Sequence, residues 1–82
     1  MPAVEVRVRV ATILLSKAVP PLDASRFDLS IQDGSTVEEL IEKLGLPPRL
    51  VGSVTVNNRR SKRDRFLKDG DKVGIVPSVA GG

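Results

Sequence analysis

The sequence lacks cysteine, histidine, tryptophan and tyrosine, and its only aromatic residues are two phenylalanines. Without cysteine, the chain can form no disulfide and no thiolate nucleophile. Without histidine, it lacks the side chain that most often serves as a general base or metal ligand, which excludes Ser-His-Asp and Cys-His catalytic sites. We therefore expect no metal site and no enzyme that acts alone, although a mechanism based on carboxylates or lysine stays open.

Long apolar runs are also absent. None approaches the roughly 20 residues that a membrane-spanning helix needs. The first residues, MPAVE, do not have the basic and then apolar pattern of a signal peptide. Together with the lack of cysteine, these features predict a cytoplasmic protein. The 82 residues suit one domain, and a content of 40% hydrophobic and 28% charged residues is typical of a folded globular chain.

Valines alternate with charged residues near the start of the chain. Residues 4–10 read VEVRVRV, which places four valines on one face and Glu5, Arg7 and Arg9 on the other. A period of two with one polar face predicts a half-buried strand. We expect this strand to continue towards Leu15.

The following segments predict a loop and a second strand. Residues 18–25, AVPPLDAS, contain two prolines and several polar residues, which favour a connection. Residues 26–32, RFDLSIQ, alternate again, with Phe27, Leu29 and Ile31 on one side. Two such strands joined by a loop indicate an antiparallel pair.

Residues 33–48, DGSTVEELIEKLGLPP, predict a turn and then a helix of about 8–9 residues. Thr36 can cap this helix, with Glu39 completing a capping box, and Ser35 with Glu38 is the alternative frame. Apolar residues recur at helical spacing on one face, namely at Val37, Leu40, Ile41 and Leu44.

The sequence also predicts where this helix ends. Gly45 can adopt the left-handed C-cap conformation, with Leu46 folding back on the last turn. Pro47 and Pro48 prevent the helix from continuing.

The second half of the chain predicts more strands. Residues 53–57, SVTVN, form a short strand with two inward valines, and asparagine at positions 57 and 58 favours a turn because it tolerates positive φ. Residues 59–65, RRSKRDR, predict a basic loop or edge strand. The sequence DGD at 69–71 predicts a tight turn before a last strand over residues 72–76, which Pro77 ends because it has no N–H group.

These elements combine into an α+β fold. The first and last strands are both expected in the middle of a mixed sheet of four to five strands, with one main helix packed on one face and the other face exposed. The expected shared core is Val4, Val6, Val8, Leu40, Ile41, Leu44, Val54, Val73 and Ile75.

Five segments together resemble one known family. The strands VRVRV and VTVN, the helix TVEELIEKLG, the turn LKDGDKV and the end VPSVAGG are similar to the MoaD/ThiS family of small sulfur-carrier proteins, from about Val4 to Gly82. This resemblance implies the ubiquitin-like β-grasp fold. It divides the chain into a β-grasp domain at residues 1–76 and a flexible Gly-Gly tail at residues 77–82.

The resemblance also implies a function. A partner that resembles ubiquitin-activating enzymes would adenylate the carboxylate of Gly82, and sulfur would then replace AMP to give a thiocarboxylate. The chain would be a non-catalytic carrier that binds no cofactor, since ATP and Mg²⁺ belong to the activating enzyme. The ending P-x-V-A-G-G favours sulfur delivery to molybdopterin, with this chain as the small subunit of molybdopterin synthase. Thiamin thiazole, a tungsten cofactor, thiolated tRNA and cysteine remain alternative recipients, and a ubiquitin-like protein modifier remains an alternative role.

The residue types in the expected tail suit a chain end that enters an enzyme and reacts there. Gly81 and Gly82 have no Cβ, so the backbone can thread a narrow channel and the acyl carbon is unhindered. The resemblance implies that Val79 and Ala80 are small apolar anchors for that channel. Pro77 is expected to stop strand pairing, so that the chain from Ser78 to Gly82 stays free.

Three residues beside the tail belong to a possible partner surface. Val76 would either touch a partner or finish the core, and the sequence leaves both open. Arg7 and Arg9 would lie on the open sheet face, where they either steer acidic partner surfaces or are simply solvated.

The net charge of +3 hides a local cluster of positive charge. Its members are Arg59, Arg60, Lys62, Arg63 and Arg65. The cluster raises nucleic-acid binding as a second hypothesis, because backbone phosphates attract such patches. Against it, we expect Phe27 and Phe66 in the core, which would leave no aromatic platform for bases.

Overall fold

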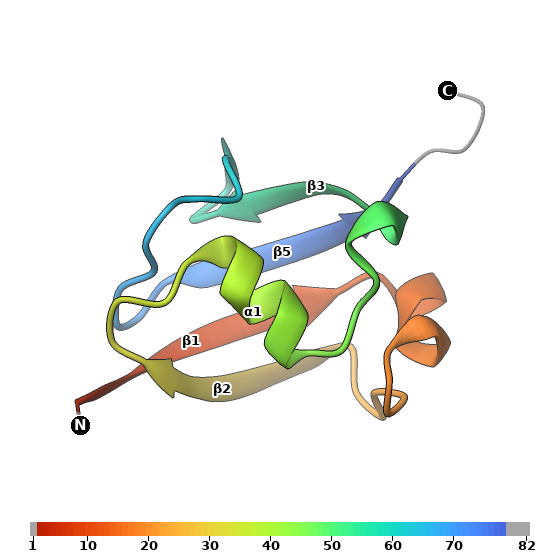
Figure 1. The fold of residues 1–82 in the computed structure, drawn as a ribbon, viewed down its shortest axis with the longest axis horizontal. Coiled ribbons are helices and arrows are strands. Elements are labelled where there is room, and N and C mark those ends of the chain that lie inside the picture. The colour runs from red at the N-terminus through yellow and green to blue at the C-terminus, as the bar shows by residue number, and fades with distance from the viewer. Residues whose placement is uncertain (1, 79–82) are drawn as a thin grey trace.

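The computed structural model describes residues 2–78, which form one mixed sheet of five strands with a single α-helix across one face (Figure 1). The strand order is β2-β1-β5-β3-β4. The strands are β1 Ala3–Val10, β2 Arg26–Gln32, β3 Val51–Val56, β4 Arg59–Ser61 and β5 Lys72–Pro77. The helical segments are η1 Thr12–Lys17, α1 Val37–Lys43 and η2 Pro48–Leu50, where η marks a 3₁₀ helix. In this described part of the chain, no helix is long and apolar enough to cross a membrane.

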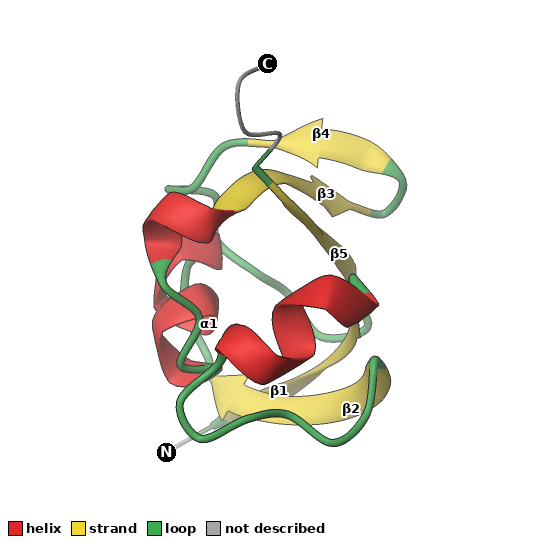
Figure 2. Cartoon of the chain, turned by 90° about the vertical axis from the view of Figure 1, so that its right-hand side faces the viewer, coloured by secondary structure: helices red, strands yellow, loops and turns green. Residues whose placement is uncertain are grey.

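The first and last strands are neighbours, as expected. Strand β1 pairs in parallel with β5 and antiparallel with β2, and β3 pairs antiparallel with both β4 and β5. Alternate residues of β1 face the helix, so Val6, Val8 and Val10 are buried while Val4 is half-buried. The other members of the expected core are all buried. Figure 2 shows the curved sheet with helical segments on one side of it.

Helix α1 begins with the expected capping box. The Thr36 side chain accepts a hydrogen bond from the Glu39 N–H at 3.2 Å, and the Glu39 carboxylate accepts one from the Thr36 N–H at 2.9 Å. The alternative frame is wrong, because Ser35 instead donates to the Gln32 carbonyl at 2.6 Å. The box satisfies backbone donors that the first turn leaves without helical partners.

The helix ends at the glycine that the sequence predicted. Gly45 has a φ of 74° and its N–H bonds to the Glu42 carbonyl, while the Leu46 N–H bonds to the Ile41 carbonyl. This pair of bonds is a Schellman motif, and Leu46 is buried against the last turn. The helix has seven residues, slightly fewer than expected.

The first strand is shorter than expected. It ends at Val10 rather than near Leu15, and the chain turns into η1, where the Leu14 N–H bonds to the Ala11 carbonyl at 2.9 Å. The period of two stops at Ala11, and the buried residues that follow, Leu14 and Ala18, are four apart, which is a helical spacing. Segment η1 packs at one end of the sheet and adds Leu14 to the core (Figure 1).

The other strands differ little from expectation. Strand β3 begins at Val51, two residues before the predicted start, and the basic segment forms the edge strand β4 at Arg59–Ser61. Asn57 and Asn58 have φ values of 55° and 68°, so the predicted asparagine turn is confirmed.

The prediction for Phe66 is wrong. Its side chain is 65% exposed, and the adjacent Leu67 is buried instead. The Leu67 N–H bonds to the Ser35 carbonyl at 2.8 Å, and Phe66 forms a β-bridge with Thr36. Neighbouring residues of extended chain point to opposite sides, so burying Leu67 turns Phe66 outward. Phe27 is half-buried against the core.

Candidate functional site

The end of β5 is the point from which the candidate tail extends. Of the tail residues, the structure describes Pro77 and Ser78, whereas Val79, Ala80, Gly81 and Gly82 lie outside the described residues. The assigned roles of those four residues therefore remain predictions.

Pro77 does not stop strand pairing, contrary to expectation. It lies inside β5, paired with Val51, and the Ser78 N–H donates to the Leu50 carbonyl at 2.8 Å. Successive backbone amides of a strand point to opposite neighbours, so the missing N–H of Pro77 faces the side of β1, not β3. Strand β1 has already ended there, so the sheet loses no hydrogen bond. Pairing with the β3 side continues through Ser78.

The start of β3 holds this end of β5 closely. A Cβ placed on Gly52 would lie 2.5 Å from the Pro77 carbonyl oxygen and 2.7 Å from the Ser78 Cα. Only glycine allows two backbones to approach so closely. The register shift between Val51 and Ser53 also falls at this position. The first two tail residues are thus fixed to the folded body by backbone contacts.

The Asp-Gly-Asp turn fixes the other end of β5. Asp69 accepts a hydrogen bond from the Glu5 N–H at 2.8 Å, which ties the turn to β1. Asp71 is buried, and its carboxylate accepts from the Asn57 side chain at 3.0 Å and from the Lys68 N–H at 2.9 Å. A buried carboxylate with such partners is a structural element. The turn therefore sets the position of β5 rather than providing a reactive group.

Val76 lies on the open face of the sheet. It is 47% exposed, while its neighbours Val73 and Ile75 are buried. The sequence left open whether Val76 contacts a partner or belongs to the core, and the structure shows that it does not belong to the core. An exposed apolar residue directly before Pro77 is available for contact with a partner.

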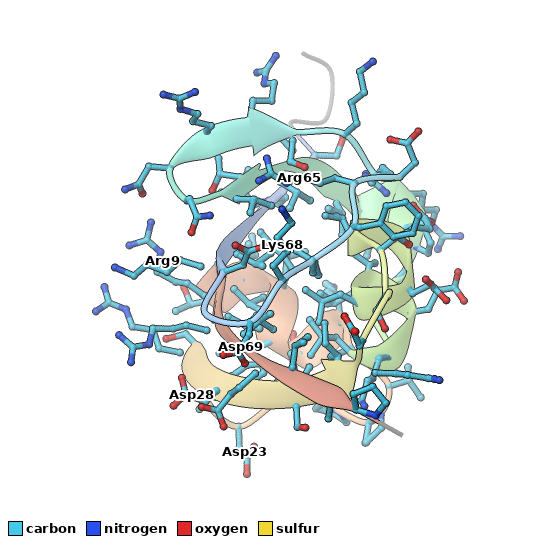
Figure 3. All side chains as sticks on the ribbon, turned by 90° about the vertical axis from the view of Figure 1, so that its left-hand side faces the viewer. Arg9, Asp23, Asp28, Arg65, Lys68 and Asp69 are labelled. Carbon is cyan, nitrogen blue, oxygen red and sulfur yellow. The ribbon has the colours of Figure 1, made fainter. Side chains whose placement is uncertain are left out.

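The two predicted arginines also lie on the open face. Figure 3 shows Arg9 pointing away from the sheet on the side opposite the helix, with Asp28 on the same side. Arg7 forms an ion pair with Asp28 at 3.4 Å, in which both side chains are more than half exposed. The structure therefore brings Arg7, Arg9 and Val76 onto one surface.

The open face is not flat. Two adjoining shallow hollows, of about 220 and 340 Å³, follow strand β5 from Lys72 to Val76. Both are lined by Arg9, Arg26, Thr55 and Gly74. Arg26, Thr55 and Gly74 were not singled out from the sequence, because their proximity depends on the strand register.

The basic segment has a partly structural role. The Arg63 side chain donates to the Val51 carbonyl at 2.8 Å and lies 3.5 Å from the Glu38 carboxylate. Its backbone carbonyl accepts from the Glu38 N–H at the start of α1. The other cations of the cluster are exposed, and two of them lie on the edge strand β4. Over residues 2–78, no group of three or more Asp and Glu side chains is arranged to hold a metal ion.

This arrangement defines the class of protein. A mixed five-stranded sheet with a parallel central pair and one main helix on one face is the ubiquitin-like β-grasp fold. A ubiquitin from Caldiarchaeum subterraneum has the same fold, with a TM-score of 0.61 at 19% identity, covering 99% of this chain and 100% of that one. The fold class expected from the sequence is thus confirmed.

A family model then assigns the chain more narrowly. The model of the ThiS family matches residues 19–82, so the chain belongs to that family. The solution structure of the Haloferax volcanii HVO 2177 protein matches with a TM-score of 0.73 at 26% identity, over 98% of this chain and 88% of that one. A Pyrococcus furiosus protein described as molybdopterin converting factor, subunit 1, matches with a TM-score of 0.69 at 24% identity, over 93% and 99%. No curated protein matches the sequence.

The family and the fold confirm the resemblance. The chain is a small ubiquitin-like protein of the MoaD/ThiS type, a class of sulfur carriers and related ubiquitin-like proteins. Such carriers are in general non-catalytic and work with an activating enzyme and a synthase.

Proposed function

We propose that the chain carries sulfur on the carboxyl group of Gly82. In the first step, a carboxylate oxygen of Gly82 attacks the α-phosphorus of ATP on a partner enzyme, and pyrophosphate leaves. In the second step, hydrosulfide attacks the acyl carbon of the adenylate, AMP leaves with the bonding pair, and a thiocarboxylate remains. A free carboxylate is a poor acyl donor, so activation as a mixed anhydride makes the sulfur attack feasible.

The main support is the span of the family match. It covers residues 19–82 and so includes the Gly81-Gly82 pair. The described structure supports the same reading, since Leu50 and Gly52 hold the backbone of Pro77 and Ser78, the first two residues of the candidate tail. A rigid attachment lets a partner locate the tail by recognising the folded body.

We further propose molybdopterin as the sulfur recipient. Support comes from the pattern of Pro77, Val79 and Ala80 before the glycines and from the description of the Pyrococcus furiosus neighbour. In that role the large subunit of the synthase supplies the catalytic groups, and this chain supplies the thiocarboxylate.

A second candidate function is attachment to other proteins. It is favoured by the structural match to a ubiquitin, which has the same fold. Activation by adenylation is common to both functions, and only the final acceptor differs.

Intact mass spectrometry tests the proposal. The full chain is incubated with an adenylating enzyme, ATP, Mg²⁺ and sulfide. We expect a mass gain equal to one sulfur in place of one oxygen, mapped to Gly82 by fragmentation. Lysine-linked adducts on other proteins without this gain would favour the modifier function, and an unmodified chain beside an active control carrier would contradict both functions.

Tail variants separate chemistry from folding. One alanine added after Gly82, or deletion of Gly82, should abolish sulfur transfer and leave the melting temperature unchanged. Gly81→Val should slow activation because a Cβ and two methyl groups narrow the approach to the acyl carbon. If the extended chain still transfers sulfur without being trimmed, the carrier proposal is wrong.

A further inference from the structure

One row of residues crosses the whole open face of the sheet. The strand registers place Arg26 opposite Arg9, Arg9 opposite Gly74, Gly74 opposite Thr55, and Thr55 opposite Arg60. All five alternate with residues that face the helix, so all five belong to the open face. The row therefore has cations at both ends and no carboxylate.

Arg9 and Arg26 are like charges directly opposite each other on antiparallel strands. Such a pair is destabilising, whereas opposite charges at this position are favourable. The neighbouring row shows the favourable arrangement, with Arg7 opposite Asp28 and an ion pair at 3.4 Å. Neither Arg9 nor Arg26 has a salt bridge within residues 2–78. A local conflict of this kind, in a fold whose other choices agree, is typical of a functional surface.

Gly74 leaves an opening in the middle of the row. A Cβ at this position would lie 2.7 Å from the Thr55 hydroxyl oxygen. With no side chain there, the hollow is floored by the backbone of β5 and bordered by Arg9 and Thr55. A ligand group that enters it meets an arginine and a hydroxyl, which are both donors to an anion.

The hollow continues towards the tail. Its second part is still lined by Arg9 and Arg26 and adds Val10, Ala11 and the exposed Val76, so apolar residues join the cations as the hollow approaches Pro77. A ligand that fits the whole hollow presents a negative group and, beside it, an apolar group.

We infer that this hollow receives an acidic segment of the protein that activates the tail, with a carboxylate over Gly74 between Arg9 and Thr55 and an apolar side chain against Val76. The inference rests on the proposed function and names the chemistry of its first partner. Continuity of the hollow with the base of the tail favours this occupant, because a partner that binds both the tail and the folded body meets the body at the end of β5, beside Val76.

A nucleic acid fits the surface less well. Bases bind single-stranded sites by stacking on aromatic rings. Phe66 lies instead beside the start of α1, bridged to Thr36, and Phe27 alternates with Arg26 and Asp28, so it faces the core side of β2. The described part of the open face thus has cations but no ring to stack on.

Charge reversal tests the inference with a matched control. Arg9→Glu and Arg59→Glu change the net charge equally, but Arg59 lies on β4 opposite Val56 and so projects from the other face. In an activation assay at low salt, we expect Arg9→Glu to lower kcat/KM about tenfold. The change should come from a higher KM with kcat unchanged, because attraction between opposite charges on the two proteins speeds their association. Arg59→Glu should change kcat/KM less than about twofold, and Arg9→Lys should retain most of the wild-type kcat/KM.

The melting temperatures of the variants show whether Arg9 and Gly74 act in docking or in folding. Arg9→Glu creates an opposite-charge pair with Arg26, so its melting temperature should equal or exceed that of the wild type. Gly74→Ala puts a methyl group on the floor of the hollow, against the Thr55 hydroxyl, without changing the charge, and we expect it to raise KM as well. Equal KM values for wild type, Arg9→Glu and Gly74→Ala would overturn the inference while leaving the carrier function intact.

A binding experiment keeps the inference testable if the wild type is not activated at all. Amide shifts of the ¹⁵N-labelled full chain are followed while a hexaglutamate peptide is added at low salt. We expect shifts at Gly74 and Thr55 that disappear in Arg9→Glu and persist in Arg59→Glu. No shift at Gly74 would overturn the inference, and so would shifts there with an octauridine RNA but not with the peptide.

Discussion

The two faces of the sheet are built from alternate residues of the same strands, yet they differ in almost every physical respect. On β1, Val6 and Val8 are buried beneath α1, while Arg7 and Arg9 are exposed. The helix-covered face is apolar and close-packed, and the open face is cationic and hollowed over Gly74. The comparison indicates that one face provides stability and the other is available for recognition. Substitutions on the two faces should therefore separate stability from activation.

The largest expected effect is on the helix-covered face. Ile41 is fully buried in α1, so Ile41→Ala should lower the free energy of unfolding by about 2–5 kcal/mol through lost burial and a residual cavity. A chain of this size has a thin core, and such a loss removes much of its stability. Urea denaturation measures the change.

The control for this prediction is Ile41→Val, which removes one methylene and should cost about 0.5–1.5 kcal/mol. At a temperature where both variants remain folded, activation should proceed at the wild-type rate. A folded Ile41→Ala variant with slow activation would show that the two faces are coupled.

The next effect concerns the place where the folded body meets the tail. Gly52→Ala puts a Cβ against the Pro77 and Ser78 backbones, so one strand must move. We expect a cost of about 1–3 kcal/mol, as for overpacking in a core. Faster hydrogen exchange at the Ser78 amide should accompany it, because that N–H bonds to Leu50 at the same site. Unchanged stability and exchange would show that the tail base is less constrained than its contacts imply.

Local patterns in the sequence predicted most of the fold. The alternating valines, the capping box and the asparagine turn each depend on residues within a few positions of one another, and each was confirmed. Their physical causes are local backbone preferences and the burial of one face, which a short segment already contains.

The failures involve contacts between distant segments. Pro77 was expected to end pairing, but whether its missing N–H matters depends on where β1 stops. Phe66 was expected in the core, but Leu67 takes that place because of a bond to Ser35, 32 positions earlier in the chain. The row through Arg9 and Gly74 is likewise set by register, and no single segment specifies register between distant strands.

A smaller effect is expected at the start of α1. Thr36→Ala removes the side-chain acceptor for the Glu39 N–H and should cost about 1 kcal/mol. Thr36→Ser keeps the hydroxyl and should recover most of the loss. Thermal unfolding of the three proteins checks the order wild type, serine, alanine, and equal stability of the alanine and serine variants would show that the cap contributes little.

The smallest effect on stability is expected on the open face. Asp28→Asn breaks the ion pair with Arg7, but both side chains are more than half exposed, so the free energy of unfolding should change by less than about 0.5 kcal/mol. The same substitution removes a negative charge beside the cationic row. If that row docks an acidic partner, kcat/KM for activation should rise slightly at low salt and return to the wild-type value at high salt, because salt screens exposed charges. Electrostatic recognition thus predicts opposite changes in kcat/KM for Asp28→Asn and Arg9→Glu at almost constant stability, and a fall in kcat/KM for Asp28→Asn would contradict it.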